Sequence, residues 1–141
     1  MSFLLDTCVL SELVRPRPTT SVLAWLEAQD EGALFVSVLT LGELHKGIAK
    51  LAHGSRKKLL SDWVQGALVP RFGPRLLPVD NAVAAAWGEI SGEHERAGTP
   101  LPVIDSLIAA TARVHGLTVV TRNAKHFRQC DATVIDPWIG G

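Results

Sequence analysis

The segment Phe3-Leu4-Leu5-Asp6 is a short apolar run that ends at an acidic residue, which is typical of a buried strand followed by a turn. Residues 34–38 and 117–121 are apolar and rich in β-branched side chains, and they predict two further buried strands. Segments with helical spacing of apolar residues separate these strands. We therefore predict an α/β fold: a three-layer α/β/α sandwich with a central parallel sheet of about four to five strands.

Capping residues predict where several helices begin and end. Thr40 and Glu43 have the spacing of a capping box, which would place Glu43 in the first turn of a helix. Asp80 is expected to cap a later helix, and Gly116 to end the helix before the strand at 117–121. The other predicted elements are helices at residues 9–14, 22–28 (capped by Thr20 or Ser21), 55–65, 81–91 and 103–115, and short strands at 76–79 and 133–135.

Composition limits the class of protein. The chain has 141 residues, of which 47% are hydrophobic, and this predicts a single domain over residues 1–141. Lys plus Arg and Asp plus Glu number 14 each, so the sequence lacks the strongly basic balance of a general DNA-coating protein. Cys8 and Cys130 are the only cysteines, too few for a cysteine-based zinc site, and their wide separation without metal-like spacing suggests a reducing compartment and no disulfide framework. With no signal-peptide pattern and no long apolar run, we expect a cytoplasmic protein without a membrane span.

Four polar residues are predicted to meet at one edge of the sheet: Asp6, Glu43, Asp105 and Asn123. Asp6 and Asn123 follow predicted strands, whereas Glu43 and Asp105 lie in first turns of helices that start at that same edge. Taken singly, each acid is also explained as a turn residue, half of a capping box or a favourable charge at a helix start. Together the acids repel one another, and a cation such as Mg²⁺ relieves that repulsion. The pattern predicts metal-dependent chemistry on a phosphate ester.

Other polar residues give weaker signals. Cys8 lies beside Asp6, but a phosphatase-type cysteine loop needs an arginine where Val14 stands, so we interpret Cys8 as a small buried residue. Glu12 is interpreted as part of a solvated helix face. The histidines show no ligand spacing, and the four tryptophans are expected in the core or an interface. Basic residues between the first helix and the middle of the chain are either solvated or a track for a phosphate backbone: Arg15, Arg17, Lys46, Lys50, Arg56, Lys57 and Lys58.

Four segments resemble the motifs of the PIN-domain family, in the family's order and spacing. They are residues 4–13 (LLDTCVLSEL), 40–44 (TLGEL), 104–112 (IDSLIAATA) and 119–123 (VVTRN), the last followed by Phe127. Each motif alone is weak, but the four together are specific and span most of the chain. The nearest group is the VapC- and FitB-type toxins of bacterial toxin–antitoxin pairs.

The resemblance implies a Mg²⁺- or Mn²⁺-dependent endoribonuclease of the toxin type that cleaves RNA. Asp6, Glu43 and Asp105 would be its acidic catalytic residues, with Asp6 and Asp105 as metal ligands. The resemblance also implies a homodimer, and an antitoxin protein that blocks the site and supplies the contact with operator DNA.

The resemblance assigns supporting roles as well. The hydroxyls of Thr7 and Thr121 would orient the carboxylates or a water molecule. Asn123 stands where the family often has an aspartate, and its neutral amide can hold water or act as an uncharged ligand. This departure leaves open whether the site takes one metal ion or two.

Two other functions are compatible with parts of the pattern. Asn123 favours a non-catalytic nucleic-acid or protein-binding module with the same fold, whereas the three acids argue against it. An aspartate-nucleophile phosphatase would use Asp6, but it needs a second aspartate where Cys8 stands. A receiver domain needs a neighbouring acidic pair, which the sequence lacks.

Overall fold

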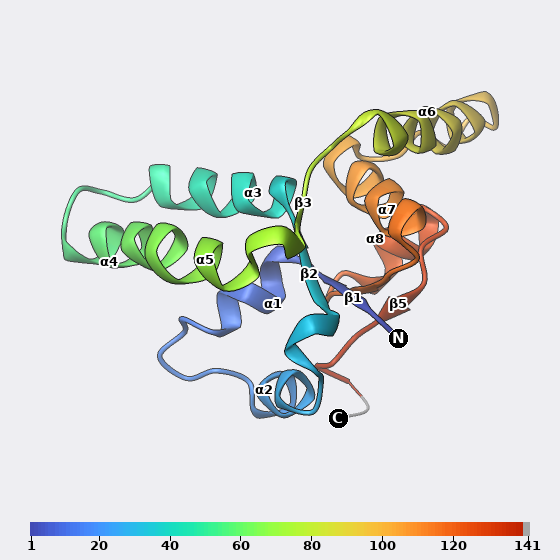
Figure 1. Ribbon diagram of the computed structural model, residues 1–141. Helices are drawn as coiled ribbons and strands as arrows, with labels where there is room; N and C mark the ends of the chain where they lie inside the picture. The colour runs from blue at the N-terminus through green and yellow to red at the C-terminus, as the bar shows by residue number, and fades with distance from the viewer. Residues whose placement is uncertain (140–141) are drawn as a thin grey trace.

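Five parallel strands form the centre of the computed structural model, which describes residues 1–139 (Figure 1). The strand order is β3-β2-β1-β4-β5, so β1 is central and pairs with β2 on one side and β4 on the other. The strands are β1 (Phe3–Leu5), β2 (Leu34–Ser37), β3 (Leu76–Leu77), β4 (Thr118–Val120) and β5 (Val134–Ile135). The predicted α/β fold with a parallel sheet is confirmed.

Helices connect the strands and cover both faces of the sheet (Figure 1). They are α1 (Thr7–Glu12), α2 (Thr20–Glu27), α3 (Val38–Ala49), α4 (Ser55–Trp63), α5 (Val69–Phe72), α6 (Asn81–Arg96), α7 (Val103–His115) and α8 (Ala124–Gln129). Short 3₁₀ turns cover Glu31–Ala33 and Gly73–Arg75, and a π-helical segment, Val64–Leu68, joins α4 to α5. In the described part of the chain, no helix has both the length and the apolar character needed to cross a membrane.

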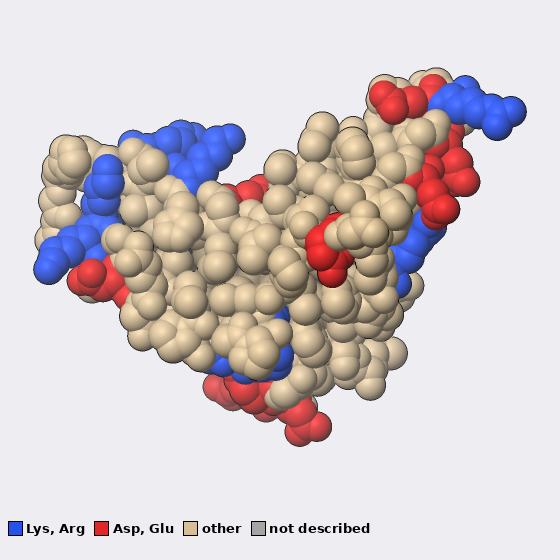
Figure 2. Space-filling view, turned by 45° about the horizontal axis from the view of Figure 1, so that its top comes forward, with Lys and Arg blue, Asp and Glu red and all other residues tan. Residues whose placement is uncertain are grey.

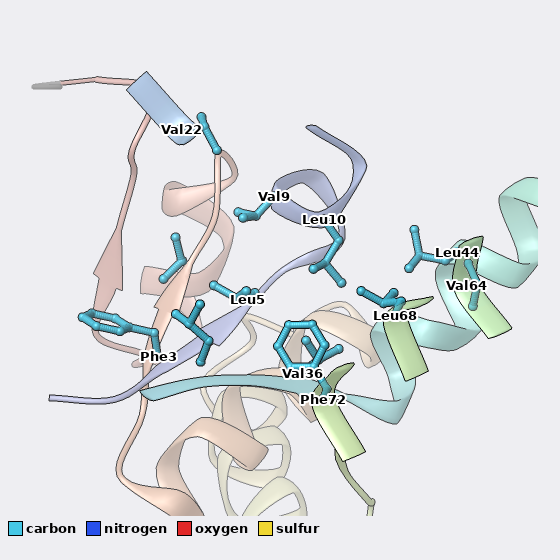
Figure 3. Close-up of a cluster of buried hydrophobic side chains, with 12 residues drawn as sticks. Phe3, Leu5, Val9, Leu10, Val22, Val36, Leu44, Val64, Leu68 and Phe72 are labelled. Atoms are coloured by element: carbon cyan, nitrogen blue, oxygen red, sulfur yellow. The ribbon is translucent and has the colours of Figure 1, made fainter. Parts of the chain in front are cut away.

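Alternation along β1 divides the core into two layers. Phe3 and Leu5 belong to a buried cluster with side chains of α1, α2, α3 and the helix through Phe72 (Figure 3). Leu4 points to the opposite face, where it packs with Ile108 of α7 and with α8. Helix α6 packs on the outer side of α7. The central strand is thus buried on both faces, as its uninterrupted apolar run predicted.

The start of α3 differs from the prediction. Ser37 is the N-cap, and its Oγ accepts a hydrogen bond of 3.0 Å from the backbone N–H of Leu39. Thr40 is fully buried inside the first turn, and its Oγ1 has no hydrogen-bond partner among residues 1–139. The predicted capping box is therefore wrong, and Glu43 lies in the second turn rather than the first. Residue 37 is both the last residue of β2 and the cap, so no linker separates strand from helix.

Four helical segments are longer than predicted, or were not predicted. The helix that starts at Ser55 continues through the π-helical segment to Phe72, because Val64, Leu68 and Phe72 are buried at four-residue spacing despite Gly66 and Pro70. Helix α6 extends to Arg96, beyond the predicted end at residue 91, and α2 begins at Thr20, two residues early. Helix α8 was not predicted, because six residues are too few to show a periodic pattern.

Other boundaries were predicted correctly. Helix α7 spans Val103–His115 as expected, and Gly116 ends it in the left-handed conformation with φ of 65°. Asp80 caps α6 by accepting a 3.0 Å hydrogen bond from the N–H of Val83. These positions depend on local chemistry, which a single sequence reveals well.

The two candidate caps of α3 can be separated by mutation. Ser37→Ala removes the observed cap and should lower the free energy of unfolding by about 1 kcal/mol. Thr40→Val, which removes a buried hydroxyl without a partner, should leave the stability unchanged or raise it. Urea denaturation of both variants measures this difference. A loss in Thr40→Val together with a neutral Ser37→Ala would restore the capping box.

Candidate active site

Asp6 stands where the central strand ends. Its backbone N–H bonds to the carbonyl of Val120 on β4, and its side chain is 6% exposed as the N-terminal cap residue of α1. The Oγ1 of Thr121 donates a 2.7 Å hydrogen bond to Asp6 Oδ2 from the neighbouring strand end. Burial raises the pKa of the Asp6 carboxyl, although the Thr121 hydroxyl and the backbone N–H of Thr7 lower it in part. Burial therefore disfavours the negative charge of Asp6, and the two hydrogen bonds offset this only in part.

Glu43 reaches the same edge of the sheet from α3. The Oγ1 of Thr7, the first residue of α1, donates a 2.7 Å hydrogen bond to Glu43 Oε1. Thr7 and Glu43 are thus tied across 36 positions of sequence. The two threonines that the resemblance singled out each hold one of the acids.

Asp105 lies in the first turn of α7, as predicted, and its side chain is 28% exposed. Burial raises the pKa of its carboxyl, and the negative charge of Glu43 raises it further. Asp105 in turn contributes to the raised pKa of Asp6. Because the charge of Asp105 acts on Asp6 and the charge of Glu43 acts on Asp105, the three predicted acids form one electrostatically coupled cluster. We call Asp6, Glu43 and Asp105 the acidic cluster.

Asn123 is placed beside this cluster through its backbone. Its N–H donates a 2.9 Å hydrogen bond to Thr121 Oγ1, the hydroxyl that also binds Asp6. The side chain of Asn123 is exposed at the start of α8 and makes no capping hydrogen bond. The backbone contact therefore fixes the position of the loop, while the amide stays available to solvent.

Two residues near the cluster were not recognised in the sequence as parts of a site. The Sγ of Cys8 lies 3.7 Å from Asp6 Oδ2 and 3.6 Å from Thr121 Oγ1, and accepts a hydrogen bond from the N–H of Arg122. Burial raises the pKa of the Cys8 thiol, which keeps it protonated beside the carboxylate. His126 on α8 has its Nδ1 4.0 Å from Asp105 Oδ2. His126 gives no spacing signal because α8 reaches the cluster only through the fold, whereas Cys8, on α1 close to Asp6, was interpreted as a small buried residue.

Glu12 is a correction. The sequence predicted that Glu12 lies on a solvated helix face, but the residue is buried, with 1% of its surface exposed. It accepts hydrogen bonds from Thr19 Oγ1 at 2.6 Å and from Arg15 at 3.0 Å, and the Thr19 hydroxyl does most to lower the pKa of its carboxyl. Glu12 therefore fastens the loop between α1 and α2.

Two grooves flank Glu43, and both include Thr7, Glu43 and Gly47. The first, which we call the apolar groove, has a volume of about 350 Å³ and lies between α1, α3 and α4. It is lined by Thr7, Ser11, Val14, Arg15, Glu43, Leu44, Gly47, Ile48, Leu51, Arg56, Leu60 and Trp63. The second, which we call the lysine groove, has a volume of about 500 Å³ and is lined by Thr7, Leu39, Gly42, Glu43, Lys46, Gly47, Lys50 and Ile104.

Comparison with known proteins places this geometry in a family. The sequence profile of the PIN domain matches residues 3–132. The chain belongs to the PIN domain family. Toxin FitB of Neisseria gonorrhoeae is 38% identical to it over 135 residues, covering 96% of this chain and 97% of FitB. VapC ribonuclease Y4jK of Sinorhizobium fredii is 34% identical over 134 residues, covering 95% of this chain and 96% of Y4jK.

A solved structure shows the same fold. The structure of FitAB bound to the IR36 DNA fragment has a TM-score of 0.89 and is 37% identical in sequence, with 96% of this chain and 95% of that chain covered. The predicted resemblance to PIN domains and to FitB- and VapC-type toxins is confirmed.

The donor atoms of this PIN domain suit a hard divalent cation. Within residues 1–139, no three His, Cys, Asp or Glu side chains are arranged as a complete metal centre. Asp6 and Asp105, however, are two oxygen donors with raised pKa values whose negative charges repel each other. Mg²⁺ and Mn²⁺ accept one or two carboxylates and fill their other positions with water. The residues present therefore fit such an ion.

Repulsion within the acidic cluster predicts a pH-dependent stability without metal. A carboxyl with a raised pKa stabilises the fold when protonated, and this contribution is lost as pH rises from the ordinary value of 3.8 through the raised pKa. Asp105→Asn should therefore raise the melting temperature of the metal-free protein at neutral pH, by roughly 2–4 °C. The gain should vanish below pH 3.8.

Calorimetric melting in EDTA across this pH range measures the effect. Asp30→Asn, at an exposed position away from the cluster, is the control and should change little. A lower melting temperature for Asp105→Asn at neutral pH would assign Asp105 a structural role instead.

Proposed function

We propose that this PIN domain is the toxin of a type II toxin–antitoxin system, and that it acts as a metal-dependent endoribonuclease on RNA phosphodiester bonds. One relative is named a toxin and another a ribonuclease. The observation that carries the proposal is the acidic cluster: Asp6 follows β1, Glu43 lies on α3 and Asp105 on α7. The negative charge of Glu43 acts on Asp105, and that of Asp105 acts on Asp6.

Asp6 and Asp105 would hold the ion, which would be Mg²⁺ or Mn²⁺. When bound, it supplies a polarised water and positive charge beside the phosphate. The chain keeps Asp6 in place through Thr121, whose hydroxyl engages Oδ2 and leaves Oδ1 open as a ligand. These two strand ends are adjacent in the sheet, so the ligand is held by rigid elements.

Glu43 acts as the general base. Thr7 engages Oε1, so Oε2 is the oxygen that accepts a proton from the attacking water. Asn123 contributes an uncharged amide that holds a water molecule. Because Asn123 adds no negative charge, Asp6 and Asp105 favour one tightly bound ion over two.

Cleavage of RNA tests this assignment. Asp6→Asn and Asp105→Asn should each lower the rate of Mg²⁺-dependent cleavage by at least about 100-fold, because each removes a charged ligand. EDTA should abolish the wild-type activity, and Asp30→Asn should retain it. The measurement is a gel assay with labelled RNA and purified protein.

The alternative is a PIN module that binds nucleic acid or protein without catalysis, which Asn123 favours because it takes the place of an acid. Binding of RNA without metal-dependent cleavage by the wild type would establish this alternative.

We also propose an antitoxin partner that occupies the apolar groove and carries the contact with operator DNA. The groove is lined by Glu43 of the acidic cluster and by Thr7, which is hydrogen-bonded to Glu43, so an apolar segment bound there would block the site. The structural neighbour FitAB is a complex bound to DNA, which supports a DNA contact made through a complex.

Leu51→Glu tests the apolar groove. Leu51 lines it and is 37% exposed, so a charge there should not unfold the chain. Affinity for the co-encoded antitoxin should fall at least about tenfold in calorimetric titration, because a carboxylate would be buried in the interface. Leu59→Glu, at an exposed α4 position outside the groove, is the matched control. Equal affinities for the two variants would contradict this docking site.

We propose that the chain forms a homodimer. Four exposed aliphatic side chains lie at or just before the starts of α3, α6 and α7: Val38, Val79, Val103 and Ile104. Exposed aliphatic side chains of this kind are suited to an interface. Sedimentation should show a dimer at micromolar concentration, and a monomer throughout would contradict the proposal.

A further inference from the structure

The lysine groove runs along one face of α3. Leu39, Gly42, Glu43, Lys46 and Lys50 follow the three- and four-residue spacing of a single helical stripe. Lys46 lies about one turn beyond Glu43, and Lys50 lies one turn beyond Lys46. A ligand in the groove would therefore pass both lysines before it reaches the acidic cluster.

These lysines lack acidic partners. In residues 1–139, no carboxylate lies within 4.0 Å of the ammonium groups of Lys46 or Lys50, whereas Arg15, Arg71 and Arg75 are all paired with glutamates. Two like charges one helical turn apart repel each other. Neither ammonium group forms an ion pair within residues 1–139, so both charges are available to an external anion.

Two glycines leave the groove open along the helix. Gly42 and Gly47 lie inside α3, where glycine is unfavourable. Apart from the adjacent residues and the backbone of α3 itself, no atom of the described chain lies within 4 Å of a Cβ placed at either position. Close packing in the described chain therefore does not require them. Their effect is to let another molecule's backbone approach α3 closely.

The surface charge points the same way. Figure 2 shows Lys and Arg gathered at the end of the molecule formed by α3 and α4. Asp and Glu are prominent at the α6 end, where some Lys and Arg also lie, and at the lower edge of the view. A polyanion approaching the acidic cluster is attracted from the α3 side and repelled from the α6 side.

We propose that the lysine groove binds the sugar–phosphate backbone of single-stranded RNA, with Lys46 and Lys50 contacting successive phosphates. This inference rests on the proposed function and adds the path of the substrate. No aromatic side chain lines the groove, so it offers no platform for base stacking. The groove therefore positions the strand without reading its sequence.

Salt dependence of RNA binding tests this path. A labelled, short single-stranded oligoribonucleotide is titrated with protein in EDTA, where the proposed hydrolysis does not proceed, and anisotropy gives Kd at several salt concentrations. Lys46→Gln/Lys50→Gln should weaken binding about tenfold and flatten the slope of log Kd against log salt by about 1.4, since each contact with a single strand contributes about 0.7.

A matched double variant controls for net charge. Lys58→Gln/Arg96→Gln also removes two positive charges, but from α4 and the end of α6, outside the groove. Its slope should stay close to that of the wild type. Equal slopes for the two double variants would show that only net charge matters and would overturn the proposal.

Gly42→Leu tests the close approach independently of charge. Leucine is the better helix former, so the melting temperature should not fall, while RNA affinity should decrease because the side chain fills the groove. Unchanged affinity would contradict an RNA strand lying against α3.

Cleavage in Mg²⁺ separates this inference from the proposed function. Lys46→Gln/Lys50→Gln should raise KM about tenfold with little change in kcat, because the lysines bind substrate away from the reacting phosphate. Wild-type cleavage with unchanged KM in this variant would refute the groove and leave the function standing. Lysine-dependent binding without wild-type cleavage would refute the function and retain the groove. Loss of antitoxin binding with RNA binding intact would assign the groove to the protein partner instead.

Discussion

The buried carboxylate of Asp6 is the constraint on which the rest of the site depends. It ends the central strand, where burial disfavours its charge, and the Thr121 hydroxyl on the neighbouring strand holds it in place. The negative charge of Asp105 raises the pKa of Asp6 further. Repulsion between these like charges lowers the stability of the metal-free fold. Such repulsion is typical of a site completed by a cation.

Glu43 links this cluster to the surface. It is bound to Thr7 on one side and lies in both grooves, so a ligand in either groove meets the same carboxylate. The apolar groove suits a protein segment, whereas the lysine groove suits a polyanion. Because the two share Thr7, Glu43 and Gly47, our proposals make substrate and antitoxin neighbours that compete for one edge of the sheet.

Much of the fold could be predicted because its signals are local. The apolar run of β1, the cap at Asp80 and the left-handed Gly116 each act within a few residues, and each was confirmed. The errors occurred where tertiary contacts override local preference. Burial of Phe72 extends a helix past Pro70, and Ser37 caps α3 because β2 runs directly into it.

The sequence by itself determined the parallel α/β fold and which acidic residues are the candidates for the site. Alternating apolar strands and helices impose the order of elements, and parallel strands bring their carboxyl ends to one edge. Tertiary structure alone decided which hydroxyl holds which carboxylate, that Cys8 and His126 lie beside the cluster, and that Glu12 is buried. Those contacts join positions up to 115 residues apart. They depend on side-chain packing in three dimensions, which the spacing of residues along a single chain does not encode.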